Sequence, residues 1–136
     1  MTQASSAFVA DSELIQELEK RSTPVTVGAD GVLFHQGELP TGVYILHKGT
    51  ARLTSKSDGD AVLSIRAGAG SLLGVPAVVG SKPYSLTAEA LNGAEVSVLK
   101  SDDFVRLMST HPNLSFRVLQ VLAEEVRFAR EALSHL

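Results

Sequence analysis

The spacing of hydrophobic and polar residues changes twice along this chain. After a polar leader, Asp11-Ser12-Glu13 opens a helical pattern in which Leu14, Ile15 and Leu18 share one face. Pro24 prevents this first helix from continuing. From Val25 to about Lys100 the pattern becomes a series of short alternating segments, and at Ser101 helical spacing returns. The pattern predicts a helix, a β-rich middle and a helical C-terminal part.

The middle of the chain contains many short extended segments separated by turn residues. The predicted strands are residues 25–27, 32–36, 43–47, 51–56, 61–67, 84–91 and 94–100. Ala29-Asp30-Gly31, Asp58-Gly59-Asp60 and Gly49 mark sharp turns, because Asp and Gly tolerate a positive φ. Such a series without a long intervening helix predicts a β-sandwich, jelly roll or barrel, with one face of each sheet exposed to solvent.

The C-terminal part predicts two helices. Ser101 is expected to be the N-cap of the first helix, with Asp102 and Asp103 in its first turn. His111-Pro112 ends this helix and starts a longer one that runs to Leu136. We therefore expect a flexible leader over residues 1–10, a helix and β domain over 11–111, and a long dimerisation helix over 112–136.

The predicted long helix carries two apolar rows. The first row is Leu119, Leu122, Val126, Ala129, Leu133 and Leu136. The second row is Leu114, Val118, Val121 and Phe128. Both rows can belong to the core of the domain, or one can form a seam between two helices of a homodimer. The two-row pattern favours the dimer, with Glu124, Glu125, Arg127, Arg130 and Glu131 solvated beside the seam.

Composition narrows the functional classes. The chain has 136 residues, a formal net charge of −3 and no cysteine. This excludes disulfides and thiolate metal sites. The charge argues against direct contact with nucleic acid, because binding to phosphates needs clustered Lys and Arg. No apolar run is long enough for a transmembrane helix, and no secretory signal is visible, so we expect a cytoplasmic, non-membrane protein.

The order of these elements is accompanied by two sequence motifs. Phe34-His35-Gln36-Gly37-Glu38 is followed, after a short spacer, by Val43-Tyr44-Ile45-Leu46-His47-Lys48-Gly49. From about Val25 to the C-terminus the chain thereby resembles the cyclic-nucleotide-binding domain of the CRP/FNR transcriptional regulators. The resemblance implies a double-stranded β-helix, or jelly roll, that senses a small molecule and is followed by a long C-terminal helix.

The resemblance also implies a phosphate-binding segment over Leu72–Thr87. In the family a Glu in this segment holds a ribose hydroxyl and an Arg pairs with the cyclic phosphate. Here Val75 occupies the position of the Glu, and Tyr84-Ser85 occupies that of Arg-Ser. Because a buried phosphate without a cationic partner keeps its desolvation cost, we expect no tight binding of cyclic AMP. The cofactor is therefore unknown, although a cyclic nucleotide remains a candidate.

The remaining neutral groups define the candidate ligand site. The resemblance places the following residues there: Gly74, Val75, Pro76, Ala77, Tyr84, Ser85, Thr87, Ala129 and Arg130. Ser85, Thr87 and backbone N–H groups of residues 74–78 remain as donors. Tyr84 is either a strand aromatic that packs in the core or a hydroxyl donor to a less charged ligand. Val75 and Pro76 can equally well fill a pocket that no longer needs water.

Other chemistry has little support in the sequence. His35, His47, His111 and His135 are scattered without metal-ligand spacing, so we expect no metal site and no haem ligation. The glycine-rich stretch 68–74 reads as a turn, and Asp102-Asp103 reads as a helix start. No catalytic constellation is present, and we expect no enzymatic activity.

Two hypotheses follow from the sequence. The first is a sensor domain of a CRP/FNR-type regulator, homodimeric through its C-terminal helix, with a degenerate phosphate-binding segment and a possible small-molecule effector. The alternative is a stand-alone dimerisation or interaction module with a vestigial pocket and no small ligand.

Overall fold

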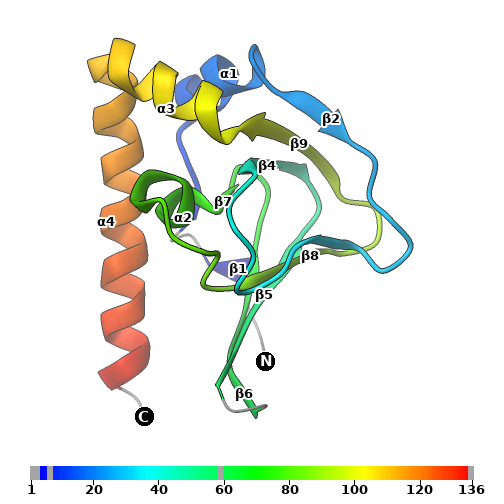
Figure 1. Ribbon diagram of the computed structural model, residues 1–136. Helices are drawn as coiled ribbons and strands as arrows, with labels where there is room; N and C mark the ends of the chain where they lie inside the picture. The colour runs from blue at the N-terminus through cyan, green and yellow to red at the C-terminus, as the bar shows by residue number, and fades with distance from the viewer. Residues whose placement is uncertain (1–3, 6–7, 58–59, 135–136) are drawn as a thin grey trace.

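The computed structural model describes residues 4–5, 8–57 and 60–134, and shows two β-sheets with helices gathered at one end and along one side (Figure 1). The strands are β1 (Ala4–Ser5), β2 (Thr23–Val25), β3 (Val32–Phe34), β4 (Gly42–Lys48), β5 (Ala51–Ser57), β6 (Asp60–Ala67), β7 (Leu72–Leu73), β8 (Thr87–Ala90) and β9 (Glu95–Lys100). The helices are α1 (Ser12–Glu19), α2 (Val75–Gly80), α3 (Ser101–Thr110) and α4 (Pro112–Ser134).

The strands form the two layers of a jelly roll. One sheet has the order β1-β6-β5-β8-β3 and the other has the order β2-β9-β4-β7. Pairing is antiparallel except between β1 and β6, which are parallel. The predicted mainly β fold with flanking helices is thus confirmed. Residues 58–59 of the predicted Asp58-Gly59-Asp60 turn lie outside the described residues. The strands on either side, β5 and β6, pair in antiparallel fashion as in a hairpin.

Two hydrophobic clusters fill the molecule. The inter-sheet cluster lies between the two sheets and includes Phe34, Leu46, Leu53 and Tyr84. The helix-side cluster lies between the second sheet and the helices, and includes Ile45, Leu99 and Phe104. Because neighbouring residues of a strand point to opposite faces, β4 contributes Ile45 to one cluster and Leu46 to the other. The expected solvent-exposed face is therefore wrong for this sheet, whose outer face is covered by helices.

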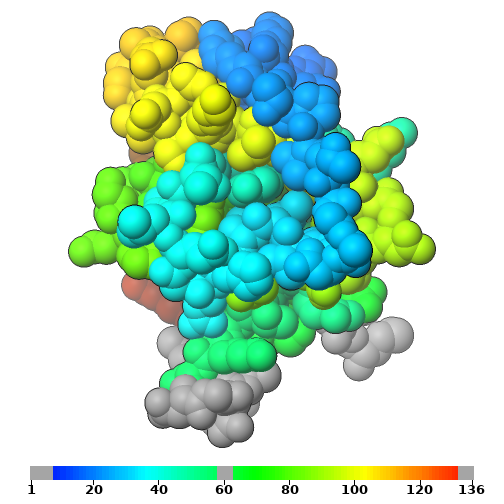
Figure 2. All heavy atoms as spheres, turned by 45° about the vertical axis from the view of Figure 1, so that its right-hand side comes forward, coloured from blue at the N-terminus to red at the C-terminus, as the bar shows by residue number. Residues whose placement is uncertain are grey.

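Helices α1 and α3 cover one end of the sandwich, and the β5–β6 hairpin extends from the opposite end (Figure 2). The Asp11 side chain caps α1 by accepting a hydrogen bond from the Leu14 N–H at 2.9 Å. Ser101 is the first residue of α3 rather than its N-cap, and its hydroxyl donates to the Pro40 carbonyl. Asp102 and Asp103 occupy the first turn as predicted.

The last residues of the predicted flexible leader, residues 8–10, are held against the domain. Phe8 and Ala10 are buried, the Phe8 carbonyl accepts a hydrogen bond from the Leu72 N–H, and the Ala10 N–H donates to Gly70. These contacts tie residues 8–10 to the turn before α2, so this part is not a loose arm. None of the helices in the described ranges is long and apolar enough to cross a membrane.

Candidate functional site

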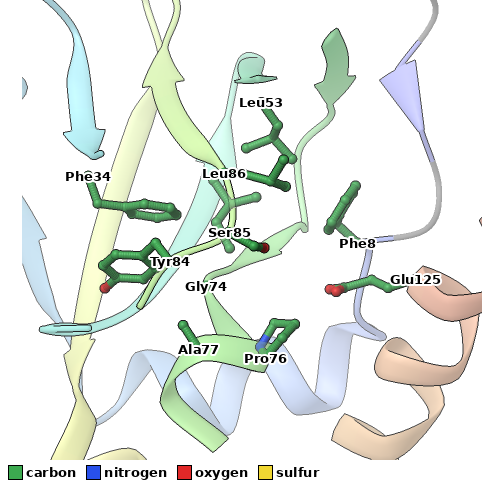
Figure 3. Close-up of a pocket in the computed structure, with 11 residues that line it drawn as sticks. Phe8, Phe34, Leu53, Gly74, Pro76, Ala77, Tyr84, Ser85, Leu86 and Glu125 are labelled. Carbon is green, nitrogen blue, oxygen red and sulfur yellow. The ribbon is translucent and has the colours of Figure 1, made fainter. Parts of the chain in front are cut away.

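A small pocket lies where α2, the loop before β8, the N-terminal segment and α4 meet (Figure 3). It offers about 50 Å³ of space to the centre of a water molecule. Five of the residues expected from the sequence line it: Gly74, Pro76, Ala77, Tyr84 and Ser85. The structure therefore brings these five residues together at one pocket.

Gly74 is the residue that allows this pocket wall to form. It has a φ of 92° and precedes α2, and a Cβ atom there would lie 2.8 Å from Cε1 of Tyr84. Only glycine combines this backbone conformation with such a close ring. Pro76 then suits the first turn of α2, where its missing N–H costs nothing.

Tyr84 is a core residue whose hydroxyl is fully engaged. Its ring stacks on Phe34 with centroids 3.8 Å apart, and its side chain is 3% exposed. The hydroxyl accepts from the backbone N–H groups of Thr41 and Gly42, at 3.1 and 3.2 Å, and donates to the Gly42 carbonyl at 2.8 Å. One donor and two acceptor positions are all that a phenol has, so none is left for a ligand.

The strand prediction was wrong at this point, because β8 begins at Thr87 rather than at Tyr84. Tyr84 and Ser85 therefore lie in the loop that leads into β8. The Tyr84 carbonyl accepts from Gly37, and its N–H donates to the Glu38 carbonyl, so the loop is held by the Gln36-Gly37-Glu38 turn. Ser85 itself is exposed and lies at the pocket.

Four expected site residues do not line the pocket. Val75 is fully buried, but in the helix-side cluster. The Thr87 hydroxyl accepts a hydrogen bond from the Gln36 N–H at 2.9 Å. Ala129 and Arg130 are exposed on α4. In this structure α4 reaches the pocket about one helical turn before Ala129, at Glu125.

Glu125 is the residue of α4 that reaches the pocket. Figure 3 shows its carboxyl pointing between Phe8 and Pro76, toward Ser85. Its Oε1 is buried without a hydrogen-bond partner in the described part of the chain, and burial raises its pKa to about 8. The expectation of a solvated Glu125 is therefore wrong. Glu125 stands among other charged residues of the helix, and nothing in the sequence distinguishes it as the one whose side chain points inward.

The sequence analysis did not predict which apolar residues line the pocket. It consists of Phe8, Phe34, Leu53, Leu73 and Leu86. Phe34 belongs to the motif that carried the resemblance, whereas Phe8 comes from the supposed leader. Among the described lining residues there is no Lys, Arg or His. The described part of the site thus combines an apolar wall with one carboxyl and offers no cation to pair with a phosphate.

The proposed dimer row is divided between exposed and buried environments. Leu119 is 58% and Val126 53% exposed, whereas Leu122 packs partly against the helix-side cluster. Ala129 is exposed. Leu133 lies on α4, but its side chain is not among those described, and Leu136 lies outside the described residues. In the second row, Leu114, Val118 and Val121 are buried and Phe128 is partly buried.

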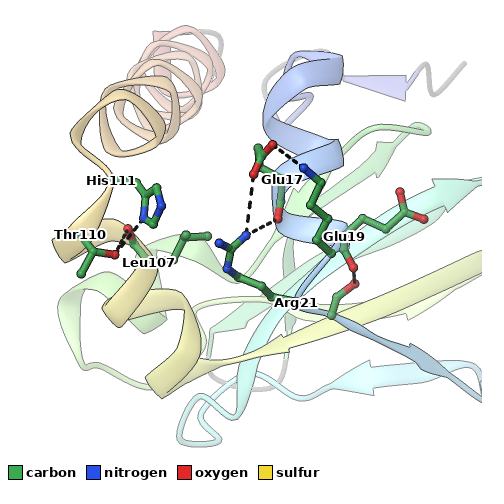
Figure 4. Close-up of polar contacts among 8 residues, drawn as sticks. Glu17, Glu19, Arg21, Leu107, Thr110 and His111 are labelled. Carbon is green, nitrogen blue, oxygen red and sulfur yellow. Dashed lines mark hydrogen bonds and ion pairs between the residues drawn. The ribbon is translucent and has the colours of Figure 1, made fainter.

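The polar contacts at the helical end are those of an exposed surface (Figure 4). Glu17 accepts from Lys20 at 2.8 Å and lies 3.8 Å from Arg21, and the hydrogen bond from Lys20 lowers the pKa of Glu17. His111 contacts Thr110, His35 contacts Glu38, and His47 contacts Ser97. Within the described ranges no three His, Asp or Glu residues are grouped to hold a metal, and His135 lies outside these ranges.

The two-layered jelly roll with its flanking helices is the fold of a cyclic-nucleotide-binding type of domain. The structure resembles the Thermus thermophilus catabolite activator protein, with a TM-score of 0.74 and 22% identity over 96% of this chain and 62% of that one. It also resembles the sensor domain of the Pseudomonas aeruginosa transcriptional regulator DNR, with a TM-score of 0.67 and 17% identity over 89% and 82% of the two chains. These similarities establish the fold.

The sequence model of the cyclic nucleotide-binding domain matches residues 24–111, and the chain belongs to this family. A lysophospholipase, NTE1, from Chaetomium globosum is 28% identical over 102 residues, which are 74% of this chain and 7% of that protein. The Pyricularia oryzae lysophospholipase NTE1 matches to the same extent. The chain therefore spans only a small part of these curated relatives.

Proposed function

We propose that this chain is the sensor domain of a CRP/FNR-type transcriptional regulator, and that its pocket does not bind cyclic AMP or cyclic GMP in the usual way. The observation that carries the proposal is the composition of the pocket wall. Its described residues provide no cation, and they include a carboxyl group. A phosphate placed there would lose its hydration without gaining a charge-assisted hydrogen bond.

The two substituted positions support this reading in different ways. Val75 is completely buried in the helix-side cluster, so it serves the core instead of contacting a ribose. Tyr84 has its ring on Phe34 and its hydroxyl on the backbone of residues 41 and 42. Both side chains pack in the core, which supports the proposal that neither position contacts a ligand.

The proposed mechanism couples the pocket to α4. A sensor of this type responds when occupancy of the pocket changes the position of the helix that forms the dimer. Glu125 belongs to both parts, since it lies on α4 and lines the pocket. The exposed Leu119 and Val126 supply an apolar surface for the second helix. A change at the pocket would thereby reach an attached DNA-binding domain.

Isothermal titration with cyclic AMP and cyclic GMP at pH 7 tests the proposal. We expect no saturable heat up to millimolar nucleotide, and no shift of the melting temperature in parallel thermal scans. A family member that retains the Glu and the Arg provides the positive control. Micromolar binding to this chain would show that neutral donors suffice, and the proposal would be wrong.

A second candidate is an interaction module without any small ligand. The exposed row on α4 favours it, together with the small volume of the pocket. The two candidates differ in one observable. A sensor changes its oligomeric state or α4 protection when its effector is added, whereas an interaction module is dimeric regardless of small molecules.

A further inference from the structure

The buried carboxyl of Glu125 has no partner in the described part of the protein. Its Oε1 is removed from solvent and makes no hydrogen bond to any described residue. Buried polar groups are nearly always hydrogen-bonded, because an unpaired one keeps its desolvation cost. The carboxyl also points into a pocket rather than into packed core (Figure 3). A buried acceptor beside an open space is the arrangement expected of a ligand contact.

Among the described residues that line the pocket, no charged side chain other than that of Glu125 is present. The N-terminal segment and α2 present Phe8 and Pro76 to the pocket. The other titratable side chain in the described lining is Tyr84, whose hydroxyl is bonded to the backbone of Gly42. On α4 itself, Arg127 lies on the exposed side, 3.8 Å from Glu124. Burial alone raises the pKa of Glu125, so its carboxyl is mostly protonated at pH 7.

The size of the pocket restricts the ligand further. About 50 Å³ of space for water centres accommodates only a few water molecules. A nucleotide is far too large for it without rearrangement, whereas a molecule of a few heavy atoms fits. Because Leu86, Phe8 and Leu53 form much of the wall, the body of that molecule should be hydrocarbon.

We propose that this pocket binds a small primary amine, with the ammonium group on the Glu125 carboxylate and a short hydrocarbon chain against the apolar wall. The inference rests on the proposed function, since it takes this pocket as the effector site. A neutral alcohol would supply one hydrogen bond and leave the carboxyl protonated. An ammonium also supplies the positive charge that the site lacks, in surroundings where water screens little.

The proton balance of this step is specific. The amine arrives as an ammonium ion, Glu125 gives up its carboxyl proton to solvent, and the two charges pair in the pocket. Binding therefore releases close to one proton per amine at pH 7, because Glu125 is protonated below about pH 8. The apparent affinity rises about tenfold from pH 6 to pH 7 for the same reason. A neutral ligand releases no proton and shows no such dependence.

The experiment compares n-butylamine, n-butanol and butyrate, which differ only at the polar end. Titration of the chain at pH 7, followed by NMR and by calorimetry in two buffers of different ionisation heat, measures affinity and proton release. We expect millimolar binding of the amine, at least tenfold tighter than that of butanol, and no binding of butyrate. Equal affinity for amine and butanol, or no proton release, would overturn the inference.

Two variants assign the effect to one side chain. Glu125→Gln keeps the shape but cannot carry a charge, and should weaken amine binding at least tenfold and abolish proton release. Glu124→Gln removes an exposed neighbouring carboxylate, and should change neither. Unchanged amine binding in Glu125→Gln would refute the assignment, and the pH profile of the unsubstituted protein provides the same test without any variant.

The outcomes separate this inference from the proposed function. Tight binding of a cyclic nucleotide would contradict the proposed function, whatever the amine does. Absence of both nucleotide and amine binding would leave the proposed function standing and would overturn only the amine inference.

Discussion

The two halves of α4 are held to the protein in different ways. Residues 112–122 place Leu114, Val118 and Val121 in the helix-side cluster, where each is at most 7% exposed. Arg117 adds ion pairs to Asp11 and Glu13 of the α1 region, at 2.9 and 3.0 Å. From residue 123 to residue 131, by contrast, no residue is fully buried, and only Glu125 and Phe128 are half-buried. One half is part of the core, and the other lies on the surface.

This difference shows where a signal can act. Packed side chains resist displacement, because the core has few empty spaces to absorb it. The second half of α4 depends on much less, chiefly on Phe128 against the inter-sheet cluster and on Glu125 in the pocket. Under the proposed function, a change at the pocket would act on the half that is held weakly, while the first half would remain as a fixed point.

Truncation of a buried and an exposed leucine, both within residues 112–122, tests which side chains anchor the first half of α4. Leu114→Ala should lower the free energy of unfolding by about 2–5 kcal/mol, because it leaves a cavity in the helix-side cluster. Leu119→Ala, at a residue 58% exposed, should change it by no more than about 0.5 kcal/mol. Urea unfolding at low protein concentration, where the protein is monomeric, measures both values. Equal losses would show that the two leucines are equally packed.

The pH dependence of stability tests the weakly held half. The folded-state pKa of Glu125 is raised from 4.5 to about 8, so the folded protein binds more protons than the unfolded chain between these values. The contribution of Glu125 to stability is then largest at pH 4.5 and below, and is lost as the pH rises toward 8. The slope is at most about 1.4 kcal/mol per pH unit, or roughly 2–3 kcal/mol from pH 5.5 to 7.5.

Glu125→Gln provides the control for this dependence. It should flatten the pH profile, whereas Glu124→Gln should leave it unchanged. The lowered pKa values of Glu17, beside Lys20, and of Glu38, beside the His35 N–H, are present in all three proteins and cancel in the comparison. A profile with the same slope in Glu125→Gln would show that Glu125 is solvated in solution.

The sequence predicted the fold better than the site because the two depend on different signals. Alternation and turn residues identified β4, β5, β6 and β9, and capping and periodicity identified α1, α3 and α4. The two-residue strands β1 and β7 are too short to show alternation. The apolar run of β4 was ambiguous, since only the covering helices explain why both of its faces are buried.

The sequence did not predict those pocket residues that are far apart along the chain. Gly74, Pro76, Ala77, Tyr84 and Ser85 are near one another in sequence, and a motif located them together. Phe8 and Glu125 reach the pocket from opposite ends of the chain. Nothing local distinguishes Glu125 from Glu124, and a shift of one helical turn separates it from Ala129. The direction of a helix against a sheet is set by packing, which periodicity alone does not specify.

The predicted dimer seam on α4 provides the last test of the difference between the two halves of the helix. The expected change, in the free energy of self-association, is the smallest of the three. Leu119→Lys together with Val126→Lys should weaken self-association at least tenfold, which corresponds to about 1.4 kcal/mol, because two exposed apolar side chains become charged. Sedimentation equilibrium measures the dissociation constant of the dimer.

Leu122 is unsuitable for the test, since it packs partly on the helix-side cluster and its substitution would also disturb the fold. Leu39→Lys with Val105→Lys adds the same charge at exposed residues outside α4, and should leave association unchanged. If self-association is unchanged by the α4 substitutions, the interface lies elsewhere. The weakly held half of α4 would then contact the pocket but not a second copy of the chain.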